Sequence, residues 1–268
     1  MRKSSLLSIL ALALLSFVLV SCGGKEKKTQ DGPKMDKLSI VMQNVSPECR
    51  DAIRKGNTSA FIEALDKTLR SDSVSAFDDN ALNDKHKLFV VCDRDHPLSE
   101  LYKPTELVTL QINQFYNICS DSLRLKKNAE KALRRMGEAA RLENITLIVE
   151  SAYRSHAEQK EIYDELLAAE ERKPLRTDDI PGCSEHQTGY AVDFVDSSEK
   201  LKKWLSENSL NYGWSMTYSS ESEYNPLHYR YLGVEACRLQ KLWFGGSQRL
   251  MLEFIAEWRR VTKESQGK

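Results

Sequence analysis

The stretch from Pro181 to Phe194 constrains this chain more than any other part of its sequence. It holds His186 and Asp193 on either side of a Thr-Gly turn signal, and after the turn apolar residues alternate as they do in a short strand. Asp193 is therefore expected inside a strand, where a carboxylate is costly to bury unless a charge or a metal ion compensates it. His186 is expected just before that strand.

A second strand-like segment, rich in aromatic residues, carries His228. Two imidazoles and one carboxylate form the ligand set of a catalytic zinc ion, which keeps its fourth position for water. The spacing of His186 and Asp193 alone also fits a hydrogen-bonded structural histidine. The candidate metal ligands of the chain are therefore His186, Asp193 and His228, and further motifs are needed to favour the metal.

Further motifs surround these candidate ligands and follow one another in order along the chain. They are Ser151-Ala152-Tyr153-Arg154-Ser155, Gln159, Ser184-Glu185-His186-Gln187-Thr188-Gly189 with Asp193, and His228-Tyr229-Arg230-Tyr231-Leu232-Gly233. Together these motifs resemble those of the zinc D-alanyl-D-alanine carboxypeptidases of the VanY type, a group that includes L,D-carboxypeptidases that trim peptidoglycan tetrapeptides. The resemblance extends from about Leu88 to about Gly233, and its most specific part is the S-E-H-Q-T-G-x-A-x-D core.

The resemblance implies a role for each matching residue. One Zn²⁺ ion would be held by the three candidate ligands, and peptidoglycan stem peptides would be the substrate. Arg154 matches the arginine of the family's Y-R-S motif and would bind the substrate carbonyl or the oxyanion, although a structural salt bridge is the alternative. Hydrogen bonds to the peptide and its terminal carboxylate are expected from Gln159, Ser184 and Arg230. Cys183, three residues before His186, is expected to be neither ligand nor nucleophile, because the matching family position is not catalytic.

One position departs from the family pattern. The family reads E-P-W-H at the second histidine, with the Glu serving as general base, whereas this chain has Asn225 three residues before His228. Asn cannot carry a proton at neutral pH, and a positioned general base contributes about 10²–10⁴-fold to the rate. Glu223 or Glu221 could substitute, although neither matches the family spacing. Three functions therefore stay open: an active carboxypeptidase, a catalytically impaired homologue that binds peptidoglycan or a protein, or a metallohydrolase of different specificity with Glu223 as its base.

The amino terminus has the pattern of an exported lipoprotein. Arg2 and Lys3 precede a short apolar run, and the small residue before Cys22 resembles a bacterial lipobox. We expect a signal peptide over residues 1–21, lipidation of Cys22, and a flexible polar tether over residues 22–36. The protein would then lie at the bacterial cell envelope, anchored to the membrane by lipid.

The remaining chain predicts an α+β fold with helices packed on a small antiparallel sheet, and the resemblance implies a hedgehog/DD-peptidase-like architecture. We expect a partly helical amino-terminal extension over 37–86, the metallocarboxypeptidase domain over 87–235, and carboxy-terminal helices over 236–268 packed on the same domain. Alternation of Leu38, Ile40 and Met42 suggests that the extension opens with a short strand. An apolar stripe predicts an amphipathic helix over 125–142.

Charge and patterning limit the partners. The 39 basic and 39 acidic residues give a formal net charge of zero, so a nucleic-acid partner is not expected. The apolar stripe near the carboxy terminus is expected to pack on the enzyme domain rather than form an oligomerisation seam, so we expect a monomer.

Overall fold

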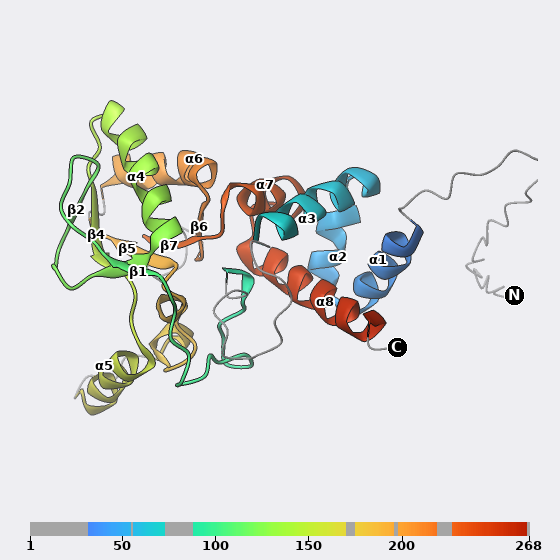
Figure 1. Ribbon diagram of the computed structural model, residues 1–268, viewed down its shortest axis with the longest axis horizontal. Coiled ribbons are helices and arrows are strands. Elements are labelled where there is room, and N and C mark those ends of the chain that lie inside the picture. The colour runs from blue at the N-terminus through green and yellow to red at the C-terminus, as the bar shows by residue number, and fades with distance from the viewer. Residues whose placement is uncertain are drawn as a thin grey trace, which may run out of the picture.

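The computed structural model describes residues 32–54, 56–72, 88–169, 175–195, 198–218 and 227–266. Two parts are visible in Figure 1: a sheet with helices around it, and a group of helices that contains the carboxy terminus. The α-helices are α1 (Gly32–Asn44), α2 (Pro47–Arg54), α3 (Thr58–Asp72), α4 (Lys127–Leu142), α5 (His156–Ala168), α6 (Glu199–Asn208), α7 (Val234–Trp243) and α8 (Gln248–Gln266). The strands are β1 (Leu107–Thr109), β2 (Tyr116–Ile118), β3 (Arg124–Lys126), β4 (Leu147–Ser151), β5 (Ala191–Phe194), β6 (Trp214–Met216) and β7 (His228–Tyr231).

The central sheet has five strands in the order β2-β4-β5-β7-β6, and β1 pairs with β3 in a separate two-stranded sheet. Three pairs of the central sheet are antiparallel, but β2 and β4 are parallel. The α+β class is confirmed, and the sheet that was expected to be antiparallel is antiparallel except for this one parallel pair. The parallel pair arises because α4 lies between β2 and β4 in the chain and supplies the crossover that parallel strands require.

Helix α4 shows how local sequence builds this domain. Its apolar residues recur at helical spacing, and one face is fully buried, including Leu133 and Met136 at 0% exposure. The predicted amphipathic helix is therefore confirmed. Helix α5 begins at a capping box, in which Ser155 accepts from the Glu158 backbone and Glu158 accepts from the Ser155 backbone.

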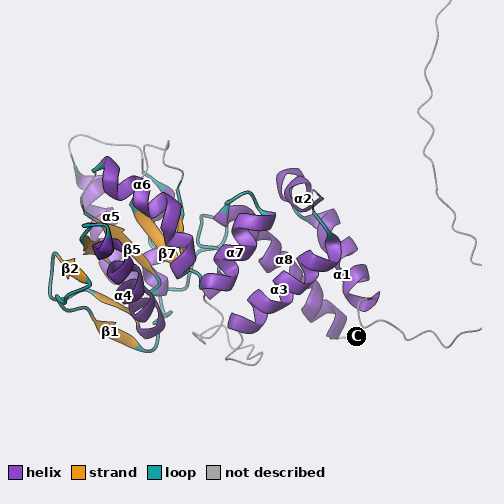
Figure 2. Cartoon of the chain, turned by 90° about the horizontal axis from the view of Figure 1, so that it is seen from above, coloured by secondary structure: helices purple, strands orange, loops and turns teal. Residues whose placement is uncertain are grey.

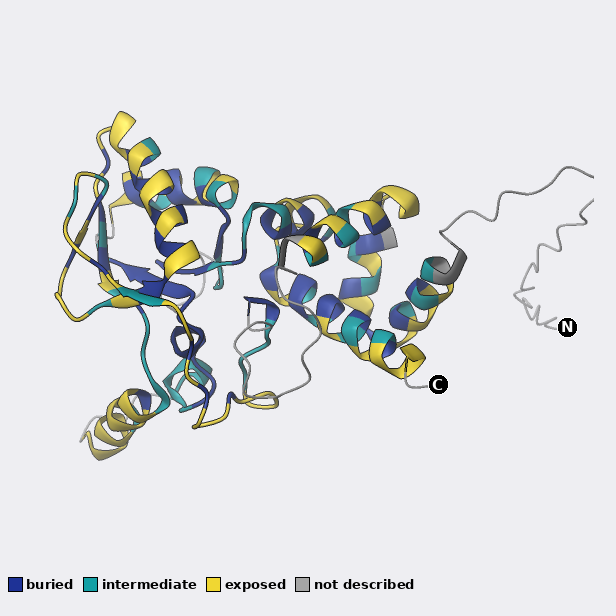
Figure 3. Cartoon of the chain, viewed as in Figure 1, coloured by how far each residue is buried: buried dark blue, intermediate teal, exposed yellow. Residues whose placement is uncertain are grey.

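The first and last helices of the described chain form one helical unit. Helix α8 packs against α1 and α2, and α3 packs against α7, as Figure 2 shows. Figure 3 shows buried residues on the facing sides of these helices. The predicted extension and the predicted carboxy-terminal helices therefore share a core with each other, and α7 also contacts β6 of the sheet domain. None of the described helices combines the length and apolarity that a membrane span requires.

The structure of helix α1 differs from two predictions made from the sequence. The strand suggested at Leu38 is wrong, because residues 32–44 are helical and the buried side chains Leu38, Val41 and Val45 follow a three-to-four-residue spacing. The helix begins at Gly32, so the last residues of the predicted tether 22–36 are helical as well. The signal peptide 1–21 and the lipidation site Cys22 lie outside the described residues.

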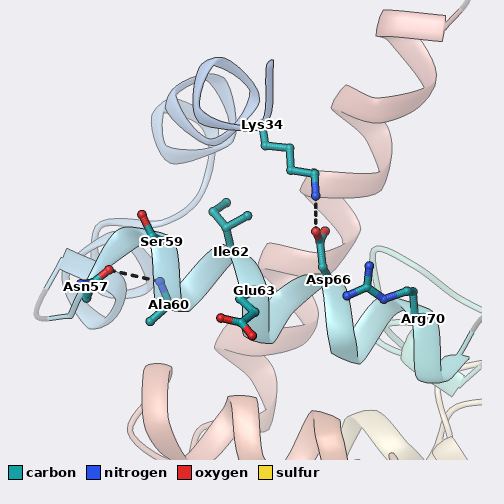
Figure 4. A pocket seen from close by; sticks show the side chains of 8 residues that line it. All are labelled: Lys34, Asn57, Ser59, Ala60, Ile62, Glu63, Asp66 and Arg70. Carbon is teal, nitrogen blue, oxygen red and sulfur yellow. Dashed lines mark hydrogen bonds and ion pairs between the residues drawn. The ribbon is translucent and has the colours of Figure 1, made fainter. Parts of the chain in front are cut away.

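A hollow of about 420 Å³ lies between α1 and α3 (Figure 4). Lys34 crosses it from α1 to form an ion pair with Asp66 on α3, which ties the two helices together. Its other charged residues, Glu63 and Arg70, also come from α3. The hollow lies within the helical unit and contains none of the candidate site residues.

Candidate metal centre

The three predicted ligands meet at the middle of the sheet. One nitrogen of each imidazole and one carboxylate oxygen lie within 4.8 Å of one another, and all three residues are buried. His186 Nε2 lies 3.1 Å from Asp193 Oδ2, and His228 Nδ1 lies 2.9 Å from Asp193 Oδ1. Asp193 thus bridges the two histidines, each through a different oxygen.

Strand register and a glycine turn create this meeting point. Asp193 on β5 is the direct antiparallel partner of His228 on β7, so both side chains rise from the same face of the sheet. The chain between His186 and β5 turns at Gly189, which has φ +73°. A Cβ at Gly189 would lie only 3.0 Å from Leu107 Cδ2. The turn predicted from the Thr-Gly pair therefore requires glycine.

The second nitrogen of each imidazole has its own hydrogen-bond partner. His186 Nδ1 lies 2.6 Å from the backbone oxygen of Ala152, and His228 Nε2 lies 3.2 Å from Glu185 Oε2. A ring nitrogen that donates to an oxygen fixes the tautomer and leaves the other nitrogen's lone pair for a metal. His186 Nε2 and His228 Nδ1 are therefore the available ligand atoms, and both face Asp193.

The donor set fits a divalent metal ion such as zinc. Two imidazoles and a carboxylate are common zinc ligands, and a catalytic site has three protein ligands with one position left open. The orientation of both rings toward Asp193 supports this assignment. Without a metal, Asp193 is a buried anion whose charge is compensated by His228.

Burial and charge act in opposite directions on these groups. Burial lowers the pKa of His186, and Asp193 only partly offsets this. Burial also disfavours charged His228, but hydrogen bonds to Asp193 and Glu185 raise the pKa of His228 to about 9. Burial alone would raise the pKa of Asp193, yet the two histidines hold it well below its ordinary value. The metal-free centre therefore keeps Asp193 ionised and His228 protonated near neutral pH.

Arg154 lies beside this centre and is held by Gln159. The Arg154 guanidinium donates to Gln159 Oε1 at 2.8 Å and to Ser151 Oγ at 3.3 Å. Burial lowers the pKa of Arg154, while the charge of Asp193 raises it. Gln159 in turn donates to the backbone oxygen of Asp179 at 2.8 Å. The predicted catalytic arginine is thus fixed next to the metal ligands.

The predicted substrate-binding residues are buried, which changes the interpretation of two of them. Gln159 is 1% exposed and orients Arg154, so its observed role is to position that side chain. Arg230 is 0% exposed and donates to Glu185 Oε1 at 2.7 Å and to the Leu88 backbone oxygen at 2.9 Å. Arg230 is therefore a structural cation rather than an exposed substrate contact. Ser184 is 2% exposed, and its Oγ has no hydrogen-bond partner within the described part of the chain.

Glu185 is the residue of this site to which the sequence assigned no role. Its Oε1 accepts from Arg230 and from Gln248 at 2.9 Å, and its Oε2 accepts from Thr217 at 2.6 Å and from His228. Burial opposes its charge, but Arg230 and His228 together hold the pKa of Glu185 far below its ordinary value. Its position next to His186 in the motif is the only sequence signal for this role.

Other expectations have mixed outcomes. Cys183 Sγ donates to the Asp93 backbone oxygen at 3.2 Å, and burial raises the pKa of its thiol, which does not favour a nucleophile. Asn225 and its possible substitutes Glu221 and Glu223 lie outside the described residues.

Comparison with known proteins agrees with this geometry. Residues 122–234 match the VanY family, D-alanyl-D-alanine carboxypeptidase. The chain is 27% identical over 257 residues to YodJ of Bacillus subtilis (strain 168), which carries the provisional name of a carboxypeptidase; the match covers 89% of this chain and 93% of YodJ. It is 33% identical over 120 residues to a D-alanyl-D-alanine carboxypeptidase of Enterococcus faecalis (strain ATCC 700802 / V583), over 37% of this chain and 45% of that protein.

A solved structure shares the fold. The LdcB LD-carboxypeptidase superposes with a TM-score of 0.51 at 24% identity, over 67% of this chain and 88% of that one. The family match spans β4, β5 and β7, the strands that lie at the candidate metal centre. The match to the VanY family of D-alanyl-D-alanine carboxypeptidases therefore covers residues 122–234 of this chain, which include His186, Asp193 and His228.

Proposed function

We propose that this chain is a zinc-dependent carboxypeptidase that removes a terminal D-alanine from peptidoglycan stem peptides. The observation that carries the proposal is the meeting of His186, Asp193 and His228, with their ligand atoms turned toward one another within a VanY-family domain. A bound zinc ion would lower the pKa of its water and polarise the scissile carbonyl. The protein's own contribution is to hold these ligands in a buried setting.

Arg154 is the group proposed to bind substrate. Its guanidinium is always charged and can donate two parallel hydrogen bonds to a carboxylate or to a developing oxyanion. Gln159 and Ser151 use part of its donor capacity and fix its orientation. Because Arg154 is partly buried, its bonds to substrate are stronger than in open water.

The test is release of D-alanine by the full chain. Synthetic pentapeptide and tetrapeptide stem peptides are incubated with the protein after chelation and again after zinc is restored. We expect release that depends on zinc and is abolished in His228→Ala. If no D-alanine is released from either peptide under any metal condition, the proposed carboxypeptidase reaction is wrong. The same assay separates D,D from L,D specificity, because the pentapeptide ends in D-alanyl-D-alanine and the tetrapeptide does not.

Asn225 supports a second candidate function, a module that binds peptidoglycan peptides without cleaving them. If this is correct, the wild-type chain binds stem peptide with no turnover, and Asn225→Glu creates activity. Turnover by the wild type that matches Asn225→Glu would exclude it.

The proposed location is the bacterial cell envelope. The supporting pattern is the short apolar run after Arg2 and Lys3, followed by Cys22 in a lipobox-like context. Metabolic labelling with a lipid analogue tests it, with Cys22→Ser as the control. Equal labelling of both chains would contradict lipidation at Cys22.

A further inference from the structure

Glu185 links the metal centre to three other segments of the chain. Each of its two oxygens accepts two hydrogen bonds, and the donors come from β7, from the residue after β6 and from the start of α8. Glu185 is 6% exposed, so these donors replace the water that a carboxylate would otherwise bind. The position of Glu185 Oε2, which accepts from His228, therefore depends on the other donors.

The ring of His228 needs this acceptor to keep its orientation. A rotation of the imidazole by half a turn would exchange Nδ1, which faces Asp193, for a carbon atom. The hydrogen bond from Nε2 to Glu185 opposes that rotation, because a rotated ring would leave a buried carboxylate oxygen without this donor. Glu185 thus helps to keep Nδ1 directed at the position of a metal.

Gln248 is the donor that comes from outside the VanY-family region. It is the first residue of α8 and is 4% exposed, and its Nε2 donates to Glu185 Oε1 at 2.9 Å and to Thr217 Oγ1 at 3.2 Å. Thr217 uses its own hydroxyl hydrogen to donate to Glu185, so the three side chains close a ring of hydrogen bonds. Only the NH₂ end of the Gln248 amide can donate to a carboxylate, so Glu185 fixes its orientation.

The helical unit holds Gln248 in place. Helix α8 packs along α1 and α2, and Glu253 accepts from the Ser46 backbone at 2.6 Å and from the Ser46 hydroxyl at 3.1 Å. A side chain near the amino end of α8 is therefore anchored by helices on the far side of the molecule from β2 (Figure 1).

We infer that Gln248 is a positioning residue of the metal centre, through which the helical unit orients Glu185 and, in turn, the His228 ring. The inference rests on the proposed metal site. The helical unit would then contribute to metal binding. If α8 were displaced, Glu185 would lose the hydrogen bond from Gln248, and the His228 ring would be held less firmly.

The test compares Gln248→Glu with a matched control, Gln240→Glu. Gln240 is a buried glutamine of α7, at 2% exposure, that donates to Ser215 Oγ and to the Gly246 backbone oxygen. Both substitutions replace a donor amide by a carboxylate of the same shape, but only Gln248→Glu places that carboxylate against Glu185. Zinc affinity of the full chain is measured by chelator competition, and the His228 imidazole nitrogens are followed by NMR in the metal-free chain.

We expect Gln248→Glu to weaken zinc binding by about 10–100-fold, the range for groups that orient a metal ligand, and to shift the His228 nitrogen resonances. Gln240→Glu should change neither. Equal zinc affinity and unchanged His228 resonances in Gln248→Glu would overturn the inference. If Gln248→Glu does not fold, the pair Gln248→Ala and Gln240→Ala decides by the same criteria, with a smaller loss expected for Gln248→Ala.

The outcomes separate this inference from the proposed function. A wild-type chain that binds zinc and releases no D-alanine contradicts the reaction but leaves the role of Gln248 standing. A wild-type chain that is active, together with Gln248→Glu that binds zinc normally, contradicts only the role of Gln248. The metal-free resonances of His228 test the positioning even when no zinc binds.

Discussion

Replacing Arg230 by methionine tests whether this arginine is structural or binds substrate. Arg230 is 0% exposed and is the nearest full positive charge to Glu185, at 2.7 Å. Methionine has a similar length but no charge and no donors. The change therefore leaves Glu185 buried with hydrogen bonds from neutral groups and from His228, and it removes the donor to the Leu88 backbone.

The structure sets the expected magnitude. Breaking a buried ion pair by removing one partner costs about 3–5 kcal/mol, because the remaining charge stays buried without full compensation. A whole domain is typically stable by about 5–15 kcal/mol, so Arg230→Met removes a large part of that stability. Adding Glu185→Gln to Arg230→Met should recover part of the loss, because no uncompensated carboxylate is left.

The assay is urea unfolding of the full chain with a chelator present, so that metal binding does not contribute. Arg238→Met is the control, because Arg238 forms an exposed pair with Glu235 at 3.1 Å and exposed pairs contribute about 0–1 kcal/mol. If Arg230→Met unfolds at the same urea concentration as the wild type and raises KM for stem peptide, the structural role is refuted. Arg230 would then bind the substrate peptide, as the sequence predicts.

Three further predictions concern the chemistry of the site. Asn225→Glu is expected to raise kcat by about 10²–10⁴-fold in the D-alanine assay if the family position supplies the general base; an unchanged kcat would show that another group does so. Arg154→Lys keeps the positive charge but loses the planar guanidinium that can form two parallel hydrogen bonds. We therefore expect kcat/KM to fall while the zinc affinity, measured by chelator competition, stays at the wild-type value. A parallel loss of zinc affinity would show that Arg154 has a structural role instead. In the metal-free chain, the pKa of His228 is raised from 6.5 to about 9, since Asp193 and Glu185 outweigh the effect of burial. The stability that its charge contributes is therefore complete below about pH 6.5 and lost as pH rises through about 9. The difference in unfolding free energy between wild type and His228→Gln should shrink over that range, and a constant difference would contradict the raised pKa.

The match of residues 122–234 to the VanY family and the α+β class could be predicted because their signals are local. The Thr-Gly turn and the alternation after it fixed Asp193 on a strand, and the structure places it opposite His228 on the neighbouring strand. The resemblance carried by the ordered motifs was then enough to predict that the three candidate ligands share one site, because it does not depend on how the rest of the core packs.

The errors arose where tertiary packing decides. Leu38 and Ile40 alternate over a window too short to separate a strand from a helix, and the buried Val41 and Val45 reveal the helical period only when the core is known. The alternation of β7 predicts which face of the sheet Arg230 lies on. No nearby residue in the sequence indicates that Glu185 packs on that face and buries the Arg230 side chain. The contact between Glu185 and Gln248 joins residues 63 positions apart, so no sequence spacing could indicate it.

The zinc stoichiometry of the full chain, measured after chelation and titration with zinc, decides whether these residues form a metal centre. One ion per chain is expected for the wild type, with binding lost in His186→Ala, Asp193→Ala and His228→Ala. A wild-type chain that binds no zinc, or triad variants that bind as tightly as the wild type, would contradict a metal centre at these three residues.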